Sequence, residues 1–368
     1  MAEKTPSTVC FASSKVKELR RDATLPAKFE RLLEMYPLKD MFGNRRVAIK
    51  MHVGGDLGYT TIHPLFVRIL VQTIKNAGGK PFITDGSGSQ QNAVARGYTE
   101  EVLGAPFVEA AGIANQYSYE REIKYQTLDA VDLCGNIVDA DAMVVFSHGK
   151  GHGHCGFGGA IKNIAMGCVA KDSRGKIHRL QGEKFTWDAD KCNHCHTCVD
   201  NCPSSGAIWF DEDDILKWND HNCRYCRHCD LACPEHAIHL STEGIEHFQT
   251  GMALTTQKVL ETFAENTVLF VTMLLNITPY CDCWGFSTPA LVPDIGIAAS
   301  TDIVAVEQAS LDLIRFEDFI PSALPAPLSL GEGSHLFERI HGKDPYLQVA
   351  CAERIGLGSR NYTLEAVD

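Results

Sequence analysis

The 368-residue sequence lacks an excess of positive charge, a long apolar run and a hydrophobic N-terminus. Its 34 lysines and arginines are outnumbered by 46 aspartates and glutamates, which gives a net charge of −12. A chain without a basic excess has no general attraction for phosphate backbones, so we expect no nucleic-acid partner. With 45% hydrophobic and 22% charged residues the composition is globular, and the length suits roughly two domains.

Nothing in the sequence is typical of a membrane span or a signal peptide. The longest strongly apolar run covers 268–275, whereas a membrane helix needs about 20 such residues. Residues 1–21 are polar and carry charges of both signs, unlike a secretory signal. We therefore expect a cytoplasmic protein with no membrane partner, in which thiols stay reduced.

Cysteine is the abundant exception, with 15 residues in the chain. In a reducing compartment this number predicts metal ligation or thiol chemistry rather than a disulfide framework. Eight of the cysteines form two runs with the same pattern, Cys-x-x-Cys-x-x-Cys-x-x-x-Cys-Pro, which begin at Cys192 and Cys223. Zinc ribbons use two widely separated Cys-x-x-Cys pairs instead, so a pair of zinc sites fits this spacing poorly.

The repeated pattern is the spacing of bacterial two-cluster ferredoxins, in which the fourth cysteine of each run ligates the other cluster. We therefore predict two 4Fe–4S clusters. The predicted ligands are Cys192, Cys195, Cys198 and Cys233 for one cluster, and Cys223, Cys226, Cys229 and Cys202 for the other. The fourth cysteine of each run is expected to begin a short helix that reaches the other cluster.

The rest of the sequence alternates between short apolar strands and amphipathic helices. Strands are expected at 46–53, 81–84, 142–146 and 267–277, and helices after Pro64 and at 251–263 and 304–314. This rhythm predicts an α/β fold, with a mostly parallel sheet core and helices on both faces. Ligands of such sheets collect beyond the carboxyl ends of the strands. Those ends carry Lys50, His52, Asp85 and His148; the alternative for Asp85-Gly86 is a simple turn.

A small α+β ferredoxin-like insertion is predicted to interrupt this core. The expected division is 1–185 for the first part of the α/β core, 186–241 for the insertion and 242–368 for the second part. The proline-rich stretch 321–327 and the tail after it are expected to be loop and terminal wrapping.

A glycine- and histidine-rich segment, 147–167, precedes a short helical pattern that contains Lys162. Such a loop exposes backbone N–H groups at a helix start and suits an anionic group. It is neither a Walker A motif nor a dinucleotide fingerprint, so we predict no ATP or NAD. One interpretation is a pocket in which Lys162, His152 and His178 hold a small anionic substrate or act as acid and base. The other is a structural turn with a solvated lysine.

Cys281 and Cys283 follow the strand expected at 267–277. If that strand continues, the two thiolates share one face, because residues two apart in a strand point the same way. They could then form a third metal or cluster site with an open coordination position, which Cys155 and Cys168 could approach. The alternative is a pair of ordinary buried cysteines.

Four motifs together resemble the domain-of-unknown-function 362 family, whose members are often labelled iron–sulfur centre proteins. They are VAIKMHVG at 47–54, GGAIKNIAMG at 158–167, TPYCDC at 278–283 and VPDIG at 292–296. The resemblance covers about residues 45–315 and implies a cytoplasmic, anaerobe-type iron–sulfur protein. The order His152, Lys162, His178 is also similar to that of the nickel-pincer lactate racemases, where two histidines and a cofactor-linking lysine surround a similar turn. That resemblance implies a pocket around Lys162, and we do not carry over the racemase activity.

These observations favour a redox enzyme whose clusters deliver single electrons to a site near Lys162 and the Cys281/Cys283 pair. Two other functions remain open: an electron-transfer protein or subunit that docks a redox partner, and a protein that binds or matures a metallocofactor. Clusters with four thiolates add negative charge to an acidic chain, so a redox partner protein is expected to offer a basic face.

Overall fold

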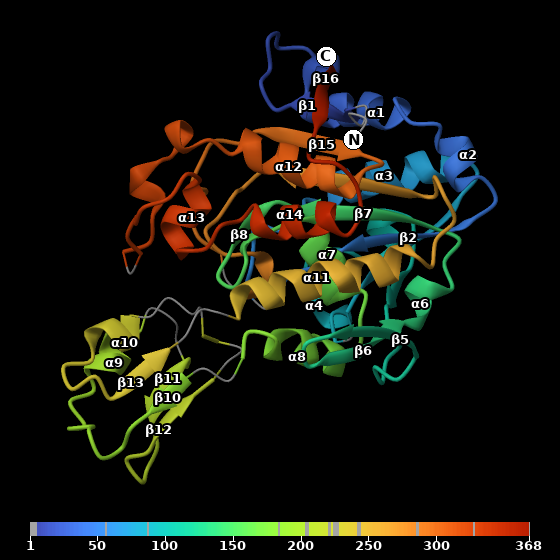
Figure 1. Ribbon diagram of the computed structural model, residues 1–368. Helices are drawn as coiled ribbons and strands as arrows, with labels where there is room; N and C mark the ends of the chain where they lie inside the picture. The colour runs from blue at the N-terminus through green and yellow to red at the C-terminus, as the bar shows by residue number, and fades with distance from the viewer. Residues whose placement is uncertain are drawn as a thin grey trace.

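An eight-stranded sheet organises the protein in the computed structural model, which describes residues 6–367 apart from 56, 87, 183–184, 203–205, 220–221, 224–227, 241–243, 285–286 and 327 (Figure 1). The strands, in spatial order, are β16 (Tyr362–Val367), β1 (Ser7–Ser13), β15 (Gly296–Ser300), β14 (Val268–Leu274), β7 (Ala142–His148), β2 (Arg46–Met51), β3 (Lys80–Asp85) and β4 (Phe107–Glu109). Only the pairings of β15 with β1 and with β14 are antiparallel. The predicted α/β fold with a mostly parallel sheet is confirmed.

Alternating side chains of the central strands supply two hydrophobic cores, one on each face of the sheet. In β7, Met143 and Val145 belong to one core, and Val144 and Phe146 belong to the other. The first core is covered by α7 (Ala160–Gly167), α11 (Ile245–Leu260), α12 (Ile303–Leu313) and α14 (Leu347–Arg354), and the second by α1 (Leu25–Glu34) and α3 (Pro64–Asn76). Helices thus cover both faces, as predicted.

Helix α3 begins where the sequence predicts. Pro64 occupies its first turn, where a missing N–H costs nothing, and His63 Nδ1 accepts a hydrogen bond from Leu65 N at 3.1 Å. Further helices are α2 (Leu38–Phe42), α4 (Gln90–Ala95), α5 (Glu100–Leu103), α6 (Gly135–Val138), α8 (Lys171–Arg179) and α13 (Leu336–His341). Outside both the sheet and the cysteine-rich segment, two antiparallel hairpins are formed by β5 (Ser118–Tyr125) with β6 (Leu128–Cys134) and by β8 (Lys150–His152) with β9 (Gly156–Gly158). Four 3₁₀ turns complete the description: η1 (Arg21–Ala23), η2 (Asp282–Trp284), η3 (Phe316–Asp318) and η4 (Pro321–Ala323).

The expectation of an irregular C-terminal tail is wrong. The tail contains α13, α14 and β16, and β16 pairs in parallel with β1 from Ser7 to Ala12. Of the six residues of β16 only Val367 is buried, so the segment carries no apolar alternation that would predict a strand. It is a strand because β1 offers an unpaired edge.

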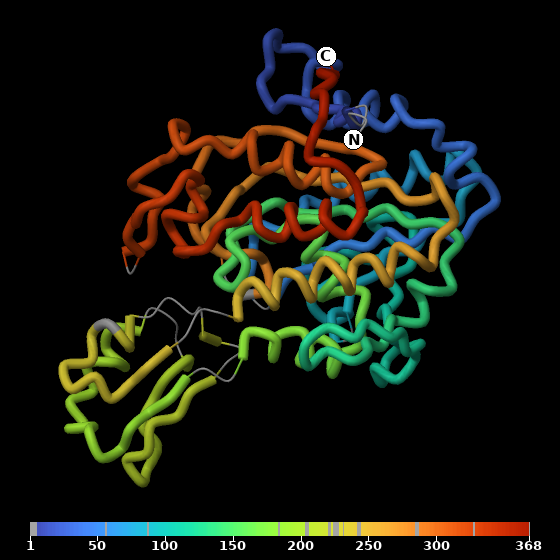
Figure 2. Tube along the Cα trace, in the orientation of Figure 1, coloured from blue at the N-terminus to red at the C-terminus, as the bar shows by residue number. Residues whose placement is uncertain are grey.

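The cysteine-rich segment folds into small elements grouped at one end of the molecule, apart from the large sheet (Figures 1 and 2). They are β10 (Phe185–Trp187), α9 (Thr197–Asp200), β11 (Ile208–Phe210), β12 (Leu216–Trp218), α10 (His228–Ala232) and β13 (Ile238–Leu240). Strand β10 pairs with β13, which brings the two ends of the segment together. The third cysteine of each run lies in a short helix and the fourth follows it, so the expectation that the fourth begins the helix is wrong.

The described part of this segment has its own hydrophobic cluster, which includes Ala207, Ile208, Leu216 and Ile238. None of its fully buried members belongs to either core of the large sheet. The boundaries 1–185, 186–241 and 242–368 remain a prediction, which an excision experiment can test. Among the described residues, no helix has the length and apolar character needed to cross a membrane.

Candidate functional site

A cavity of about 450 Å³ lies where the carboxyl ends of β2, β3 and β7 meet, the position at which parallel α/β sheets bind ligands. A volume of this size suits a small molecule. All five side chains that the sequence singles out as catalytic line it: His152, Lys162, His178, Cys281 and Cys283. The strand-end residues Lys50, His52, Asp85 and His148 line it as well, so the sequence-based choice of these positions is consistent with one pocket.

Asp85 joins two basic side chains at the end of β3. Its Oδ1 accepts a hydrogen bond from Lys50 Nζ at 3.0 Å, and its Oδ2 lies 2.9 Å from His52 Nδ1. Lys50 is fully buried and also donates to Asn163 Oδ1 at 2.6 Å. Burial opposes ionisation of Asp85, but Lys50 and His52 outweigh it and hold the pKa of this carboxyl well below its usual range. Asp85-Gly86 is therefore more than a turn.

Asp282 repeats this arrangement on the other side of the pocket. Its Oδ1 accepts from Lys150 Nζ at 2.7 Å, and its Oδ2 lies 2.9 Å from His148 Nδ1. Burial opposes ionisation here too, and the charges of His148 and Lys150 overcome it and lower the pKa of Asp282. Lys150 Nζ also donates to Thr60 Oγ1 at 2.7 Å. Neither Lys150 nor Thr60 stands out in the sequence as a residue of the site.

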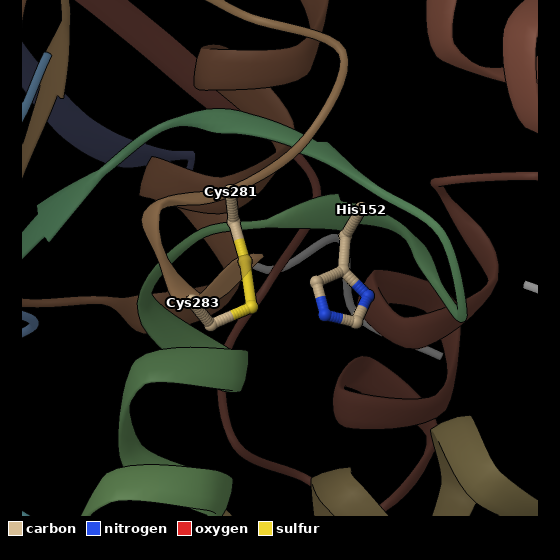
Figure 3. Close-up of side chains that lie close together, drawn as sticks. All are labelled: His152, Cys281 and Cys283. Carbon is tan, nitrogen blue, oxygen red and sulfur yellow. A yellow bond between two sulfur atoms is a disulfide. The ribbon is translucent and has the colours of Figure 1, made fainter. Parts of the chain in front are cut away.

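Cys281 and Cys283 form a disulfide beside the ring of His152 (Figure 3). The strand does not continue through these cysteines, because β14 ends at Leu274 and Asn276 adopts a left-handed conformation. The cysteines lie instead on a loop and on η2. Lys162 Nζ lies 3.5 Å from Cys281 Sγ, and burial lowers the pKa of Lys162.

His152 and the two sulfurs form a group that could hold a metal ion, with ligand atoms within 4.8 Å of one another. Cys155 and Cys168, which the sequence left as further candidates, are buried and are not part of this group, although Cys155 Sγ lies 3.2 Å from His152 Nδ1. His152 Nδ1 accepts the His154 backbone N–H at 3.2 Å, which assigns the ring proton of the neutral imidazole to Nε2. Burial holds the pKa of His152 well below its usual range, so the ring is neutral.

His178 reaches the pocket from α8 and belongs to a small group of rings. Its ring centroid lies 5.2 Å from that of His154 and 5.1 Å from that of Phe248. Gln181 contacts both histidines, through Nε2 at 3.3 Å from His178 Nδ1 and Oε1 at 3.0 Å from His154 Nδ1. This contact orients the two rings at the pocket wall.

The glycine-rich segment does place a helix N-terminus near the pocket, and a carboxyl group of the protein itself occupies it. Glu307 on α12 accepts the backbone N–H of Ala160, at the first residue of α7. A side chain at Gly159 would collide with this carboxyl group, so the glycine makes room for it. Burial raises the pKa of Glu307 to about 8. A carboxyl group of the protein therefore occupies the helix start at which the sequence suggested an anionic group.

Two further lining residues come from segments that the sequence did not connect with the pocket. Arg174, on α8, lies against Gly86, where an added Cβ would be 3.3 Å from Arg174 Nη1. Asn222 comes from the cysteine-rich segment and directly precedes Cys223. No local pattern marks either residue, because their role depends on packing between distant segments.

The first predicted ligand set gathers around a second, smaller cavity. Cys192, Cys195, Cys198 and Cys233 all line it, so a cysteine of the second run lies beside three of the first. Of the second set, Cys202, Cys223 and Cys229 lie in the described part of the chain, and Cys226 lies outside it.

Several solved structures are similar to this chain. The lactate racemase apoprotein from Thermoanaerobacterium thermosaccharolyticum is 13% identical with a TM-score of 0.36, and the match covers 73% of this chain and 51% of that one. A protein from Thermotoga maritima is 11% identical with a TM-score of 0.38, over 70% of this chain and 52% of that one. The chain thus spans about half the length of each of these structures. No curated protein matches the sequence.

The fold and the site together define an α/β protein with many cysteines and a group of residues that could hold a metal ion in a polar pocket at the carboxyl edge of its sheet. The chain belongs to the family described as Domain of unknown function (DUF362), whose sequence profile matches residues 47–312, most of its length.

Proposed function

We propose that this protein is an iron–sulfur oxidoreductase in which two 4Fe–4S clusters supply electrons to the Cys281–Cys283 pair in the central pocket. The observation that carries the proposal is the cavity lined by Cys192, Cys195, Cys198 and Cys233. Three of these thiols come from one run and the fourth from the other, which is the ligand set that the ferredoxin spacing requires.

The chemistry of this donor set suits an iron–sulfur cluster. Backbone N–H groups donate toward two of the sulfurs, His194 N to Cys192 Sγ at 3.4 Å and Ala237 N to Cys233 Sγ at 3.3 Å. Such hydrogen bonds stabilise the negative charge of cluster thiolates. His194 and His196 adopt left-handed conformations, which wind the Cys-x-x-Cys turns tightly around the cavity. Bound clusters of this type would supply single electrons at low potential.

The residue that precedes the second run lies at the central pocket. Asn222 lines that pocket together with Cys281 and Cys283, and the next residue along the chain is the predicted ligand Cys223. This proximity favours an oxidoreductase over a separate electron carrier, because an electron carrier would not need its cluster loop to border a pocket lined by titratable groups.

The disulfide is the proposed electron acceptor. Its reduction takes up two electrons, breaks the S–S bond and leaves two sulfurs that bind two protons to become thiols. The electrons come from an external low-potential electron-donor protein, and we propose that this donor protein has a basic face. The ammonium group of Lys162, 3.5 Å from Cys281 Sγ, would stabilise a thiolate. His152 carries its ring proton on Nε2 and can donate it inside the pocket. A small anionic substrate with a reducible group would reoxidise the pair: the two thiols give up two electrons and two protons to that group, and the S–S bond forms again.

A second candidate function is metal binding at the same place, favoured by the proximity of His152, Cys281 and Cys283. It requires the reduced cysteines, since only thiolates ligate metals well. It also requires an unprotonated ring nitrogen directed at the metal, whereas His152 Nδ1 already accepts a backbone N–H. The disulfide is therefore the preferred acceptor.

Protein purified without oxygen should contain about eight irons and a matching amount of acid-labile sulfide per chain. Cys195→Ser should lose about half of both, whereas the control Cys351→Ser, in the hydrophobic core of the sheet, should keep them. Zinc without sulfide would contradict the proposal. About twelve irons would place a third cluster at the central pocket and exclude the disulfide as acceptor.

The acceptor itself is tested by counting alkylated thiols by mass spectrometry, before and after one equivalent of dithionite per chain. We expect Cys281 and Cys283 to become alkylated together in the wild type, and Lys162→Ala to slow their appearance. If the thiols do not appear while the clusters become reduced, the protein is an electron carrier and the enzyme interpretation fails.

A further inference from the structure

The central pocket contains a cation that no acidic group of the described chain neutralises. Arg174 Nε is buried and has no hydrogen-bond partner among the described residues, and the guanidinium forms no ion pair with them. It lies against Gly86, one residue beyond Asp85, so it stands at the carboxyl end of β3. A pocket-lining guanidinium with a buried, unpaired Nε and no carboxylate partner among the described residues indicates that a ligand supplies the anion.

His52 offers an acceptor to the same pocket. Asp85 Oδ2 accepts the proton on His52 Nδ1 at 2.9 Å, so in the neutral tautomer that this contact selects Nε2 is a hydrogen-bond acceptor. Nε2 is buried and no described residue donates to it. A ligand that fits this position carries a hydrogen-bond donor.

The charge balance of the pocket points to a carboxylate. Asp85 is paired with Lys50 and Asp282 with Lys150, which leaves Lys162 and Arg174 as the cations without a carboxylate partner among the described residues. Phosphates in proteins are often held at helix N-termini, but Glu307 occupies the N-terminus of α7. A planar guanidinium binds a carboxylate through two parallel hydrogen bonds.

We infer that the pocket binds a small carboxylate that carries a hydrogen-bond donor next to its carboxylate group. Arg174 binds the carboxylate, and His52, positioned by Asp85, accepts from the donor. This inference names the substrate class of the proposed oxidoreductase and rests on that proposal for the reaction, while binding is independent of it.

Acetate and glycolate are suitable probes because they differ only by a hydroxyl group. Isothermal titration calorimetry on the full-length, cluster-loaded, oxidised protein should show glycolate binding roughly three- to tenfold more tightly than acetate. Arg174→Gln should weaken both by roughly tenfold or more, and Arg174→Lys should recover part of the loss. His52→Phe should remove the advantage of glycolate over acetate. The control Arg68→Gln, on the exposed side of α3, should change neither.

Three results would overturn the inference. They are equal affinity of the wild type for the two probes, unchanged affinity in Arg174→Gln, and binding of inorganic phosphate in preference to both carboxylates. Iron and sulfide are counted in every variant. A normal iron count without carboxylate binding refutes this inference alone, whereas carboxylate binding without clusters refutes the proposed electron supply.

Discussion

At the scale of single residues, the pocket is built around two buried aspartates that each contact a lysine and a histidine. The Lys50–Asp85 and Lys150–Asp282 pairs have side chains no more than 7% exposed. Burial alone would disfavour both charges of each pair, so each is stable only because the other is present. These pairs therefore hold the strand ends in place and fix the orientation of the histidines.

Removing one member of such a pair should be far more damaging than removing a surface charge. Lys50→Met leaves Asp85 buried without its lysine, and we expect the free energy of unfolding to fall by about 3–5 kcal/mol. Denaturant unfolding monitored by circular dichroism measures this change. The matched variant Lys258→Met breaks the more exposed pair with Glu261 and should cost less than about 1 kcal/mol. Equal losses of unfolding free energy in the two variants would show that the buried pair stabilises the fold no more than the exposed pair does.

At the scale of the elements, the sequence predicts where helix α7 begins but does not identify the group that its first N–H groups bind. The glycines before 160 do place a helix start beside the pocket, as the sequence indicates. What binds its N–H groups is Glu307, which lies on α12 and is distant in the sequence. Nothing in the sequence around α7 identifies this carboxyl, because the contact forms only when the two helices pack on the same face of the sheet.

The carboxyl of Glu307 should make stability depend on pH. In the folded protein it keeps its proton up to about pH 8, whereas in the unfolded chain it loses it near its ordinary pKa of 4.5. Between these values the unfolded state binds fewer protons, so the contribution of Glu307 to stability is full below pH 4.5 and is lost as pH rises toward 8. Relative to Glu307→Gln, the wild type should lose on the order of 1 kcal/mol per pH unit in this range. Denaturant unfolding of both proteins at pH 5, 6, 7 and 8 measures it; a constant difference would contradict it.

At the scale of the whole molecule, the cysteine-rich segment has a hydrophobic cluster of its own, separate from the two cores of the large sheet. The chain connects this segment to the α/β part at one place. Figure 2 shows the chain leaving the α/β part after α8 and returning at α11. Because β10 pairs with β13, with Phe185 opposite Leu240, the two crossing points are close together. Asn222 lines the central pocket, so the cysteine-rich segment contributes a side chain to the site.

Replacing 186–241 by a short Gly/Ser linker should therefore leave the large sheet folded. The two cores of the sheet contain no residue of this segment, so we expect cooperative thermal unfolding with a change in Tm of a few degrees. The shortened chain should bind no iron but should keep the Cys281–Cys283 disulfide. A shortened chain that is insoluble, or that lacks a cooperative transition, would show that the segment is not an independent insertion.

Local sequence pattern is enough to predict several elements of the fold. Short apolar runs predicted β7 and its neighbours, a proline and helical spacing predicted α3, and the cysteine spacing predicted which four thiols share a cavity. These features depend on residues that are close in the chain or that repeat a fixed spacing. Strand β16 could not be predicted from its own composition, because it is a strand only through its pairing with the edge of β1.

Which groups meet across the pocket can be seen only in the folded chain. It paired Asp282 with Lys150 and His148, put Glu307 at the N-terminus of α7, and left Arg174 without an anionic partner in the described chain. Each of these contacts joins segments far apart in the sequence, and each depends on distances of a few ångströms. Pattern determines which face of an element is buried, but the charge that a buried group meets there is set by packing.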